Sequence, residues 1–245
     1  IALIGYGKMG KAIETIALNK GHEIVLKIDI QNSQDFTEAA LQKADVAIEF
    51  TGPHSAYENV KKCITWGIPV VSGSTGWLDQ WIEIKDLCEV KNGTLIYSSN
   101  YSIGVNLFFE LNKYLAKLMD PYADYDVSMT EIHHTEKKDA PSGTAITLAE
   151  NVIKSSSTLN HWELFDNGQE INGNDSQVAL PIYAERLPNV PGTHILSFES
   201  SVDSIKLEHE AKNREGFAIG AIVAAEWLIG KTGVFGMSDL LNFEN

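Results

Sequence analysis

The residues best suited to chemistry lie close together between Glu131 and Ala145, in the stretch E-I-H-H-T-E-K-K-D-A-P-S-G-T-A. His133 and His134 are side chains that titrate near neutral pH and can donate a proton. Lys137 lies four residues after His133 and adds positive charge. The stretch therefore predicts an anion pocket with a proton donor beside it.

The residues around this stretch predict a strand before the pocket and a helix after it. Tyr125 to Ile132 alternate apolar with polar residues, which is typical of a strand. Apolar residues then recur at helical spacing, at Ile146, Ala149, Val152 and Ile153. Either Asp139 or Ser142 is expected to cap that helix. The free N–H groups of Gly143 and Thr144 would then favour a carboxylate or phosphate, although a basic surface loop that only caps a helix is the alternative.

A glycine-rich motif, G-x-G-x-x-G, follows the first apolar segment of the chain. Its residues are Gly5, Tyr6, Gly7, Lys8, Met9 and Gly10. A second predicted strand, Glu23 to Ile30, carries Asp29 at 19 positions after Gly10. In dinucleotide-binding units such glycines allow a tight turn and close approach of a pyrophosphate, and an acid at this spacing holds a ribose hydroxyl. The motif predicts a dinucleotide site; glycines that serve only packing are the alternative.

Strands alternate with helices over the first hundred residues, which predicts a doubly wound parallel sheet. Ligands of such sheets bind at the carboxyl ends of the strands. The small, polar and aromatic residues at these ends are Phe50, Thr51, Gly73, Ser74, Thr75, Ser98, Ser99, Asn100 and Tyr101. We expect them to contact the cofactor.

The pattern changes after Tyr101. A long apolar helix is expected over Val105 to Met119, and Ser155 to Ser176 has the composition of a loop. Three β-like segments then follow without helices between them, at residues 178–186, 194–200 and 204–211. An apolar helix, Phe217 to Ile229, precedes a glycine-rich tail. We therefore predict a Rossmann-type α/β domain from residues 1–103 and 214–245, and an α+β substrate domain from residues 104–213.

Composition narrows the class of protein. The chain has 245 residues, 44% of them hydrophobic, and a formal net charge of −14. That charge argues against nucleic-acid or anionic-membrane partners. Cys63 and Cys88 lack metal-ligand spacing, so we expect reduced thiols, no metal site and a cytoplasmic protein. No long apolar run or signal-peptide pattern predicts a membrane segment, and Ile1 already lies in an apolar run, so we expect residues to precede it.

The chain resembles the dihydrodipicolinate reductase family over nearly its whole length. The stretch from Glu131 to Ala145 carries most of the resemblance, with support from G-Y-G-K-M-G, F-T-G-P, G-S-T-G, S-S-N-Y-S-I-G-V-N and N-R-E-G-F-A-I-G-A. The resemblance implies reduction of 4-hydroxy-tetrahydrodipicolinate, a cyclic dicarboxylate, by NADH or NADPH in lysine and diaminopimelate synthesis. It also implies a mixed sheet in the substrate domain and a homotetramer.

The resemblance further implies roles for single residues. His133 matches the acid/base histidine and Lys137 the catalytic lysine of the family. His134, Gly143 and Thr144 match substrate-binding positions. The N-R-E-G-F segment adds two residues to the expected cofactor contacts, Arg214 and Phe217.

The end of the second strand departs from the family pattern. Relatives often have an arginine after the acid, where it can meet a 2′-phosphate, whereas Ile30 and Gln31 follow Asp29 here. Lys8 and Lys27 are the counter-evidence: Lys27 shares a strand face with Asp29 and could reach the phosphate or pair with the acid. We expect use of both cofactors, with NADH used at least as well as NADPH.

Two other classes share part of this pattern. Another two-domain dehydrogenase, acting on an amino acid or a sugar, would have the same first hundred residues but would not need H-H-x-x-K-x-D-A-P-S-G-T. A protein that binds the dinucleotide without turnover would tolerate loss of His133 and Lys137, and both are present.

Overall fold

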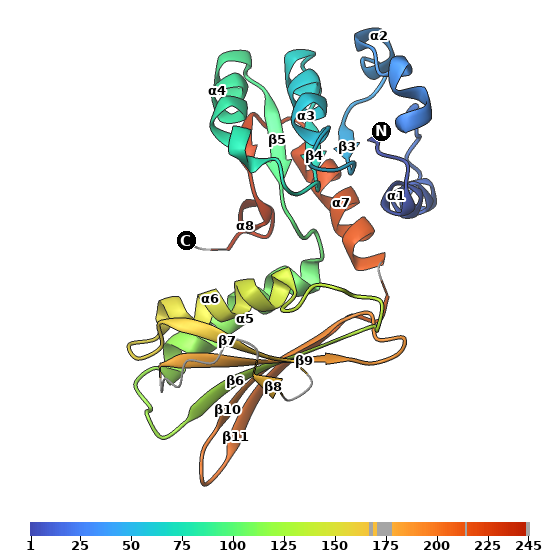
Figure 1. The fold of residues 1–245 in the computed structure, drawn as a ribbon. Coiled ribbons are helices and arrows are strands. Elements are labelled where there is room, and N and C mark those ends of the chain that lie inside the picture. The colour runs from blue at the N-terminus through green and yellow to red at the C-terminus, as the bar shows by residue number, and fades with distance from the viewer. Residues whose placement is uncertain (167–168, 171–177, 214, 244–245) are drawn as a thin grey trace. The chain divides into compact units, whose positions relative to one another are not determined.

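The computed structural model describes residues 1–166, 169–170, 178–213 and 215–243. Its chain divides into two compact units, Ile1–Asn106 with Glu215–Asn245 and Leu107–Arg214 (Figure 1). We predict that the first unit binds the cofactor and the second binds the substrate, and these roles stay a prediction.

The first unit is built on a six-stranded parallel sheet. Its strands, in spatial order, are β12 (Gly233–Phe235), β5 (Thr94–Tyr97), β4 (Val70–Ser72), β3 (Ala47–Glu49), β1 (Ala2–Ile4) and β2 (Leu26–Ile28). β2 lies on one side of β1, and β3, β4 and β5 follow on the other side. The loops that leave β1 and β3 therefore run in opposite directions at this point. Such a point is where open α/β sheets bind ligands.

Helices cover both faces of this sheet. The helices α1 (Lys8–Asn19) and α7 (Glu215–Leu228) pack on the face that carries Leu3, Ile48 and Ile96. On the other face, α3 (Ala56–Thr65) and α4 (Trp81–Lys91) pack against Ile4, Ala47 and Leu95. Because strand residues alternate between faces, both faces bury apolar side chains and the strands are nearly all apolar. Four short helical segments complete the unit: η1 (Ile30–Asp35), α2 (Glu38–Leu41), η2 (Leu78–Gln80) and α8 (Met237–Leu240).

The second unit is built on a mixed six-stranded sheet. Its strands, in spatial order, are β11 (Ser204–Glu210), β10 (Thr193–Glu199), β6 (Asp126–His133), β9 (Ala179–Arg186), β7 (His161–Asp166) and β8 (Gln169–Glu170). β9 runs parallel to β6 and β7, and the other pairs are antiparallel. The helices α5 (Ile103–Met119) and α6 (Gly143–Ser155) lie along one face (Figure 1), over a core that includes Met129, Ile182 and Leu196. The predicted fold class, a Rossmann-type sheet with a second mixed-sheet unit, is confirmed.

Three expectations about elements need correction. The loop expected over Ser155 to Ser176 contains β7 and β8, and its residues 167–168 and 171–176 lie outside the described part. β7 was missed because it is only six residues long and its apolar residues, Trp162, Leu164 and Phe165, lie within a polar segment and do not alternate strictly. The glycine-rich tail contains β12, whose sequence of three residues shows no period. The second strand is shorter than Glu23 to Ile30, because Asp29 already caps η1.

Within the described residues, each helix is too short or too polar to span a membrane.

Candidate active site

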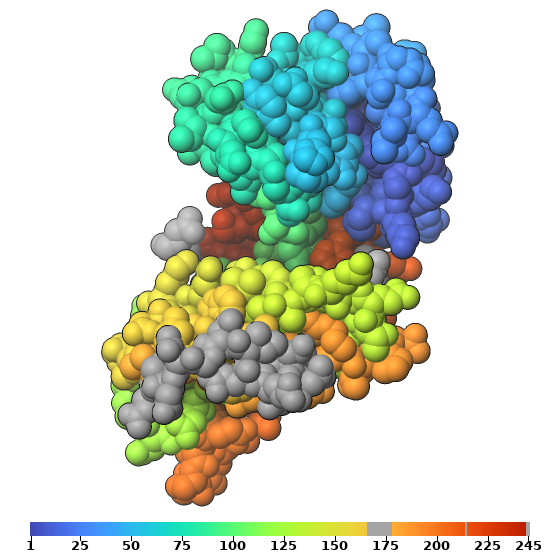
Figure 2. All heavy atoms as spheres, in the orientation of Figure 1, coloured from blue at the N-terminus to red at the C-terminus, as the bar shows by residue number. Residues whose placement is uncertain are grey.

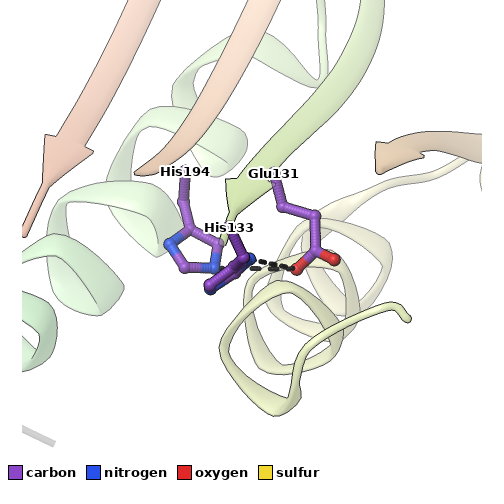
Figure 3. Close-up of side chains that lie close together, drawn as sticks. All are labelled: Glu131, His133 and His194. Atoms are coloured by element: carbon purple, nitrogen blue, oxygen red, sulfur yellow. Dashed lines mark ion pairs between the residues drawn. The ribbon is translucent and has the colours of Figure 1, made fainter. Parts of the chain in front are cut away.

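Neighbouring strands of the second sheet bring ionisable side chains together on its helix-covered face. Glu131 and His133 are two residues apart on β6, so both point to that face. His194 on β10 lies opposite Glu131, and Arg186 on β9 lies opposite His133. The two imidazole rings are 5.1 Å apart and nearly perpendicular. Figure 3 shows both rings turned toward the Glu131 carboxylate.

The carboxylate of Glu131 is fully buried and has several charged or polar neighbours. Its Oε1 accepts a hydrogen bond of 3.1 Å from Nη2 of Arg186, and its Oε2 accepts one of 2.9 Å from the backbone N–H of Ser142. Nδ1 of His133 lies 3.6 Å from Oε2, and Nε2 of His194 lies 3.9 Å from it. The latter nitrogen is also 3.0 Å from the Ser142 hydroxyl.

The loop between β6 and α6 carries the predicted catalytic lysine. Nζ of Lys137 lies 2.7 Å from Oδ2 of Asp139, and this contact lowers the pKa of the Asp139 carboxyl. Arg186 donates to the carbonyl oxygens of both residues, at 3.4 Å for Lys137 and 2.7 Å for Asp139. Figure 2 shows this loop, in yellow-green, on the surface of the second unit, where Lys138 is exposed. Lys137 therefore belongs to a tethered loop open to solvent.

Helix α6 starts directly beside this cluster. Of the two expected caps, Ser142 is the residue that caps the helix, since its hydroxyl accepts from the N–H of Ala145 at 3.2 Å. Gly143 is exposed, and a Cβ at its position would meet no atom within 4 Å. Thr144 is half-buried, as is His134. The helix start therefore has free space in front of it, next to positive charge.

Burial lowers the pKa values of His133 and His194. It lowers the pKa of His133, while the Glu131 carboxylate opposes that shift. Burial and the neighbouring His133 lower the pKa of His194 to about 3. His194 is therefore neutral at physiological pH, and the ring available for proton transfer is His133.

Glu131, His133 and His194 could each offer a ligand atom to a metal ion, because these atoms lie within 4.8 Å of one another. However, Glu131 already accepts from the Arg186 guanidinium, and a cation among these atoms would be repelled by that charge. We do not assign them as metal ligands and interpret the cluster as a site for proton transfer.

The first unit contains a pocket of about 490 Å³ at the carboxyl ends of β1, β2 and β3. The predicted cofactor residues that line it are Gly5, Tyr6, Gly7, Asp29, Phe50 and Thr51. Residues outside the prediction also line it, including Phe36, His54, Asn59 and Lys62. The pocket joins the glycine turn to the acid after β2, as a dinucleotide site requires.

The three glycines differ in what they do. Gly5 has φ +97°, and a Cβ there would lie 2.1 Å from the carbonyl oxygen of Phe50. A Cβ at Gly10 would lie 2.2 Å from the carbonyl oxygen of Gly5, so this glycine allows α1 to pack on the strand. At Gly7 a Cβ would meet nothing within 4 Å, and Gly7 caps α1 without a side-chain hydrogen bond. The unobstructed helix start fits the pyrophosphate of a dinucleotide.

Other predicted cofactor residues do not line this pocket. Lys8, Met9 and Gly10 begin α1, and the rest follow β4 or β5 or belong to α7: Gly73, Ser74, Thr75, Ser98, Ser99, Asn100, Tyr101 and Phe217. Tyr101 is buried, and its hydroxyl donates to the carbonyl oxygens of Ser72 and Ile96. Arg214 lies outside the described residues. Contact of these residues with the cofactor stays a prediction.

The sequence interpretation assigned no role to three residues of the cluster, Glu131, Arg186 and His194, and expected Ser142 only as a possible helix cap. Glu131 could have been found, because it precedes His133 by one strand period and shares its face. Arg186 and His194 follow His133 at distances that depend on strand pairing, so no local motif marks them.

Comparison with known proteins decides the family. The family model described as "Dihydrodipicolinate reductase, N-terminus" matches residues 1–101, and the one described as "Dihydrodipicolinate reductase, C-terminus" matches residues 104–241. The chain belongs to the dihydrodipicolinate reductase family. The resemblance inferred from the sequence is therefore confirmed.

Individual relatives agree along nearly the full length. A 4-hydroxy-tetrahydrodipicolinate reductase of Christiangramia forsetii is 47% identical over 244 residues, which cover 99% of this chain and 97% of the relative. One from Methanoregula boonei is 33% identical, with 97% and 95% covered. The dipicolinate-bound dihydrodipicolinate reductase from Paenisporosarcina sp. TG-14 has the same fold, with a TM-score of 0.75, 24% identity and 96% of both chains covered.

Proposed function

We propose that this chain reduces 4-hydroxy-tetrahydrodipicolinate with NADH or NADPH, with His133 as the proton donor and Lys137 as a stabiliser of negative charge. As a family member it is an oxidoreductase of lysine and diaminopimelate biosynthesis. The observation that supports the residue roles is the placement of His133, the Lys137 loop and the open start of α6 in one unit. A proton donor, a cation and a helix N-terminus together suit a dicarboxylate substrate.

The proposed reaction balances in atoms and in charge. Substrate, NAD(P)H and one proton give tetrahydrodipicolinate, NAD(P)⁺ and water, because the 4-hydroxyl is lost and the resulting conjugated imine is reduced. The dinucleotide supplies the hydride when bound. Negative charge that develops on the substrate is neutralised by a proton from His133, and the Lys137 ammonium stabilises it beforehand.

Protonation of His133 would follow substrate binding. Burial favours the neutral ring in the free protein. A dicarboxylate beside the ring favours the charged form, as an opposite charge within a few ångströms does. The free N–H groups of Gly143 and Thr144 would bind one carboxylate, and His134 would contact the substrate from the same loop.

The cofactor would occupy the pocket of the first unit. Gly5, Tyr6 and Gly7 would lie along its pyrophosphate, and Asp29 would accept hydrogen bonds from the adenosine ribose. The open Cβ position of Gly7 and the uncapped start of α1 support this placement.

Oxidation of NADH and NADPH in the presence of 4-hydroxy-tetrahydrodipicolinate, followed at the nicotinamide absorbance band, tests the proposal. His133→Ala and Lys137→Ala should each lower kcat by about 100-fold, the scale of a lost general acid or charge stabiliser. Matched controls are His161→Ala, on β7, and Lys154→Ala, at an exposed position of α6. Full activity in either site variant would overturn its assigned role.

The same assay separates the rival classes. An amino-acid or sugar dehydrogenase would turn over its own substrate and leave this one unchanged. A non-catalytic protein would bind the dinucleotide but oxidise none of it in any mixture.

We also propose a homotetramer in the cytoplasm. Figure 1 draws α5 and α6 on one face of the second sheet. Partly exposed apolar side chains lie on the opposite face, among them Ile132, Tyr183 and Ile195, which would be covered by another copy. Light scattering should give four times the chain mass of 27.0 kDa, and a stable monomer would contradict the proposal.

A further inference from the structure

The buried carboxylate of Glu131 lies against residues from three elements of the proposed proton-donor site. It lies 3.6 Å from Nδ1 of His133, on its own strand. It accepts from the backbone N–H of Ser142, which caps α6, and from Arg186 on β9. Its side chain is 0% exposed, so these contacts replace water as its partners.

Arg186 links Glu131 to the loop that carries Lys137. Besides the Glu131 carboxylate, it binds the carbonyl oxygens of Lys137 and Asp139. The loop that presents Lys137 is therefore held by a guanidinium that Glu131 holds in turn. The Arg186 side chain is 14% exposed and the Glu131 side chain 0%, so each charged group is oriented mainly by its partner.

We propose that Glu131 is a positioning residue for proton transfer, which orients His133 through Nδ1 and holds the Lys137 loop through Arg186. The proposal rests on the proposed function, since it assigns how the donor in that reaction is held. A carboxylate beside Nδ1 favours the ring tautomer with its proton on Nδ1 and stabilises the imidazolium. Nε2 is then the nitrogen that gives the proton to substrate.

The backbone around the ring agrees with this orientation. Nε2 of His133 faces Gly192, where a Cβ would lie 3.1 Å from that nitrogen. A side chain at position 192 would therefore crowd the Nε2 side of the ring, and glycine avoids this contact. Nδ1, in contrast, is buried and makes no hydrogen bond among the described residues, and Oε2 of Glu131 lies 3.6 Å from it, at ion-pair distance.

The charges around His133 predict how a variant behaves. Glu131 on β6 and Asp139 in the loop favour the imidazolium, whereas Arg186 on β9 and Lys137 disfavour it. His194 on β10 faces the ring and is neutral above about pH 3. Glu131→Gln removes the nearest negative charge and leaves both cations in place.

The test uses Glu131→Gln in the full-length protein. Arg186 keeps its bonds to the carbonyl oxygens of Lys137, Asp139 and Glu185 in this variant, so the loop retains partners. We expect kcat to fall about 10- to 100-fold, with KM for NADH changed by less than about threefold. The pH above which kcat/KM declines should shift down by about one unit, because the imidazolium loses its counter-charge.

Glu163→Gln is the matched control. Glu163 is also a buried glutamate on the same sheet beside a histidine, with Oε1 3.2 Å from Nε2 of His161, but it lies on the opposite face. This variant should keep both kcat and the pH profile. A Glu131→Gln enzyme with wild-type kcat and an unshifted pH profile would overturn the proposal.

The tautomer of His133 in the wild-type protein provides a second test that needs no variant. Nitrogen NMR at a pH where the ring is neutral should find the proton on Nδ1. A proton on Nε2 would overturn the proposal even if the variant fails to fold. If the wild type does not oxidise NADH with this substrate, the proposed function fails, and the tautomer still decides whether Glu131 orients His133.

Discussion

Nζ of Lys27 lies 3.2 Å from Oε1 of Glu14 and 5.1 Å from the centre of the Tyr6 ring. The Tyr6 hydroxyl donates to the other oxygen of Glu14. Asp29 is engaged elsewhere, since its carboxylate accepts from the N–H of Ile30 at 2.7 Å. Of the two roles expected for Lys27, pairing with Asp29 is therefore wrong, and its charge is already balanced by Glu14.

This pairing sharpens the prediction of cofactor preference. We expect NADH to be used at least as well as NADPH, because a 2′-phosphate would be repelled by Asp29 and would meet a lysine that is already paired. Measuring kcat/KM for both cofactors at one ionic strength checks this. A preference for NADPH of more than about tenfold would contradict it.

The variant Glu14→Gln tests the role of the pair directly. Loss of the carboxylate frees the Lys27 ammonium, so kcat/KM for NADPH relative to NADH should rise about two- to fivefold, the scale of an exposed ion pair. Glu89→Gln, at an exposed position of α4, removes the same charge elsewhere and should leave the ratio unchanged. An unchanged ratio in Glu14→Gln would show that Lys27 does not reach the cofactor.

A second prediction follows from the buried, neutral His194. Its pKa is about 3 in the folded protein, against about 6.5 in an unfolded chain. Between these values the unfolded chain binds a proton that the folded chain does not, so stability falls as pH falls below 6.5. At pH 5 the cost from His194 is about 2 kcal/mol.

Urea unfolding of wild type and His194→Gln at pH 7 and pH 5 measures this cost. The loss of unfolding free energy between the two pH values should be about 2 kcal/mol smaller in the variant. His133 and His209, whose pKa values are also lowered by burial, account for part of the remaining loss. His161→Gln is the control. Equal pH dependence in His194→Gln and wild type would contradict the assignment.

A third prediction concerns Glu49, which is fully buried at the end of β3. Its carboxylate accepts hydrogen bonds from the backbone and hydroxyl of Thr51, at 2.9 and 2.5 Å, and from the hydroxyls of Ser72 and Ser74, both at 2.8 Å. In Glu49→Gln an NH₂ group, which is itself a donor, would replace one of the two accepting oxygens and face these donors. The unfolding free energy should therefore fall by about 1–3 kcal/mol.

Because Thr51 lines the pocket of the first unit, the same change should weaken dinucleotide binding. Titration of the protein with NADH, followed by nicotinamide fluorescence, should show a higher Kd for Glu49→Gln. Glu58→Gln, exposed on α3, should bind NADH like the wild type. Unchanged stability and Kd in Glu49→Gln would mean that Glu49 does not hold this loop.

The parts of the fold predicted from sequence are those with a local pattern. The apolar strands and the glycine turn have short-range requirements, so Gly5 and Gly10 could be assigned correctly from the motif. The strand that carries His133 alternates over eight residues. Helix α6 could be placed from its apolar spacing, but the choice between Asp139 and Ser142 as cap depended on the loop path, which only the structure provides.

What could not be predicted depends on pairing between distant segments. Arg186 is 55 residues from Glu131, and His194 is 52 residues from Ser142. A shift of one residue in strand register would move each of these side chains to the other face. Tyr101 has its side chain buried against β4 and β5, a contact that no motif encodes, and its expected contact with the cofactor stays a prediction.

The last prediction concerns the contact between α7 and Tyr101. Gly220 lies in α7, and a Cβ at its position would stand 1.7 Å from the carbonyl oxygen of Tyr101. Replacing glycine by alanine in an unobstructed helix interior would stabilise the protein by about 1 kcal/mol. A loss of stability would therefore indicate a steric clash. We expect Gly220→Ala to lower the unfolding free energy by about 3 kcal/mol, because the backbone of Tyr101 cannot yield without moving its buried ring. Gly216→Ala is the control within the same helix, since a Cβ there would be 3.5 Å from the Ser102 hydroxyl, an ordinary contact. Urea unfolding measures the free energy of unfolding of both variants. If Gly220→Ala is as stable as Gly216→Ala, α7 can shift away from Tyr101 and the prediction is wrong.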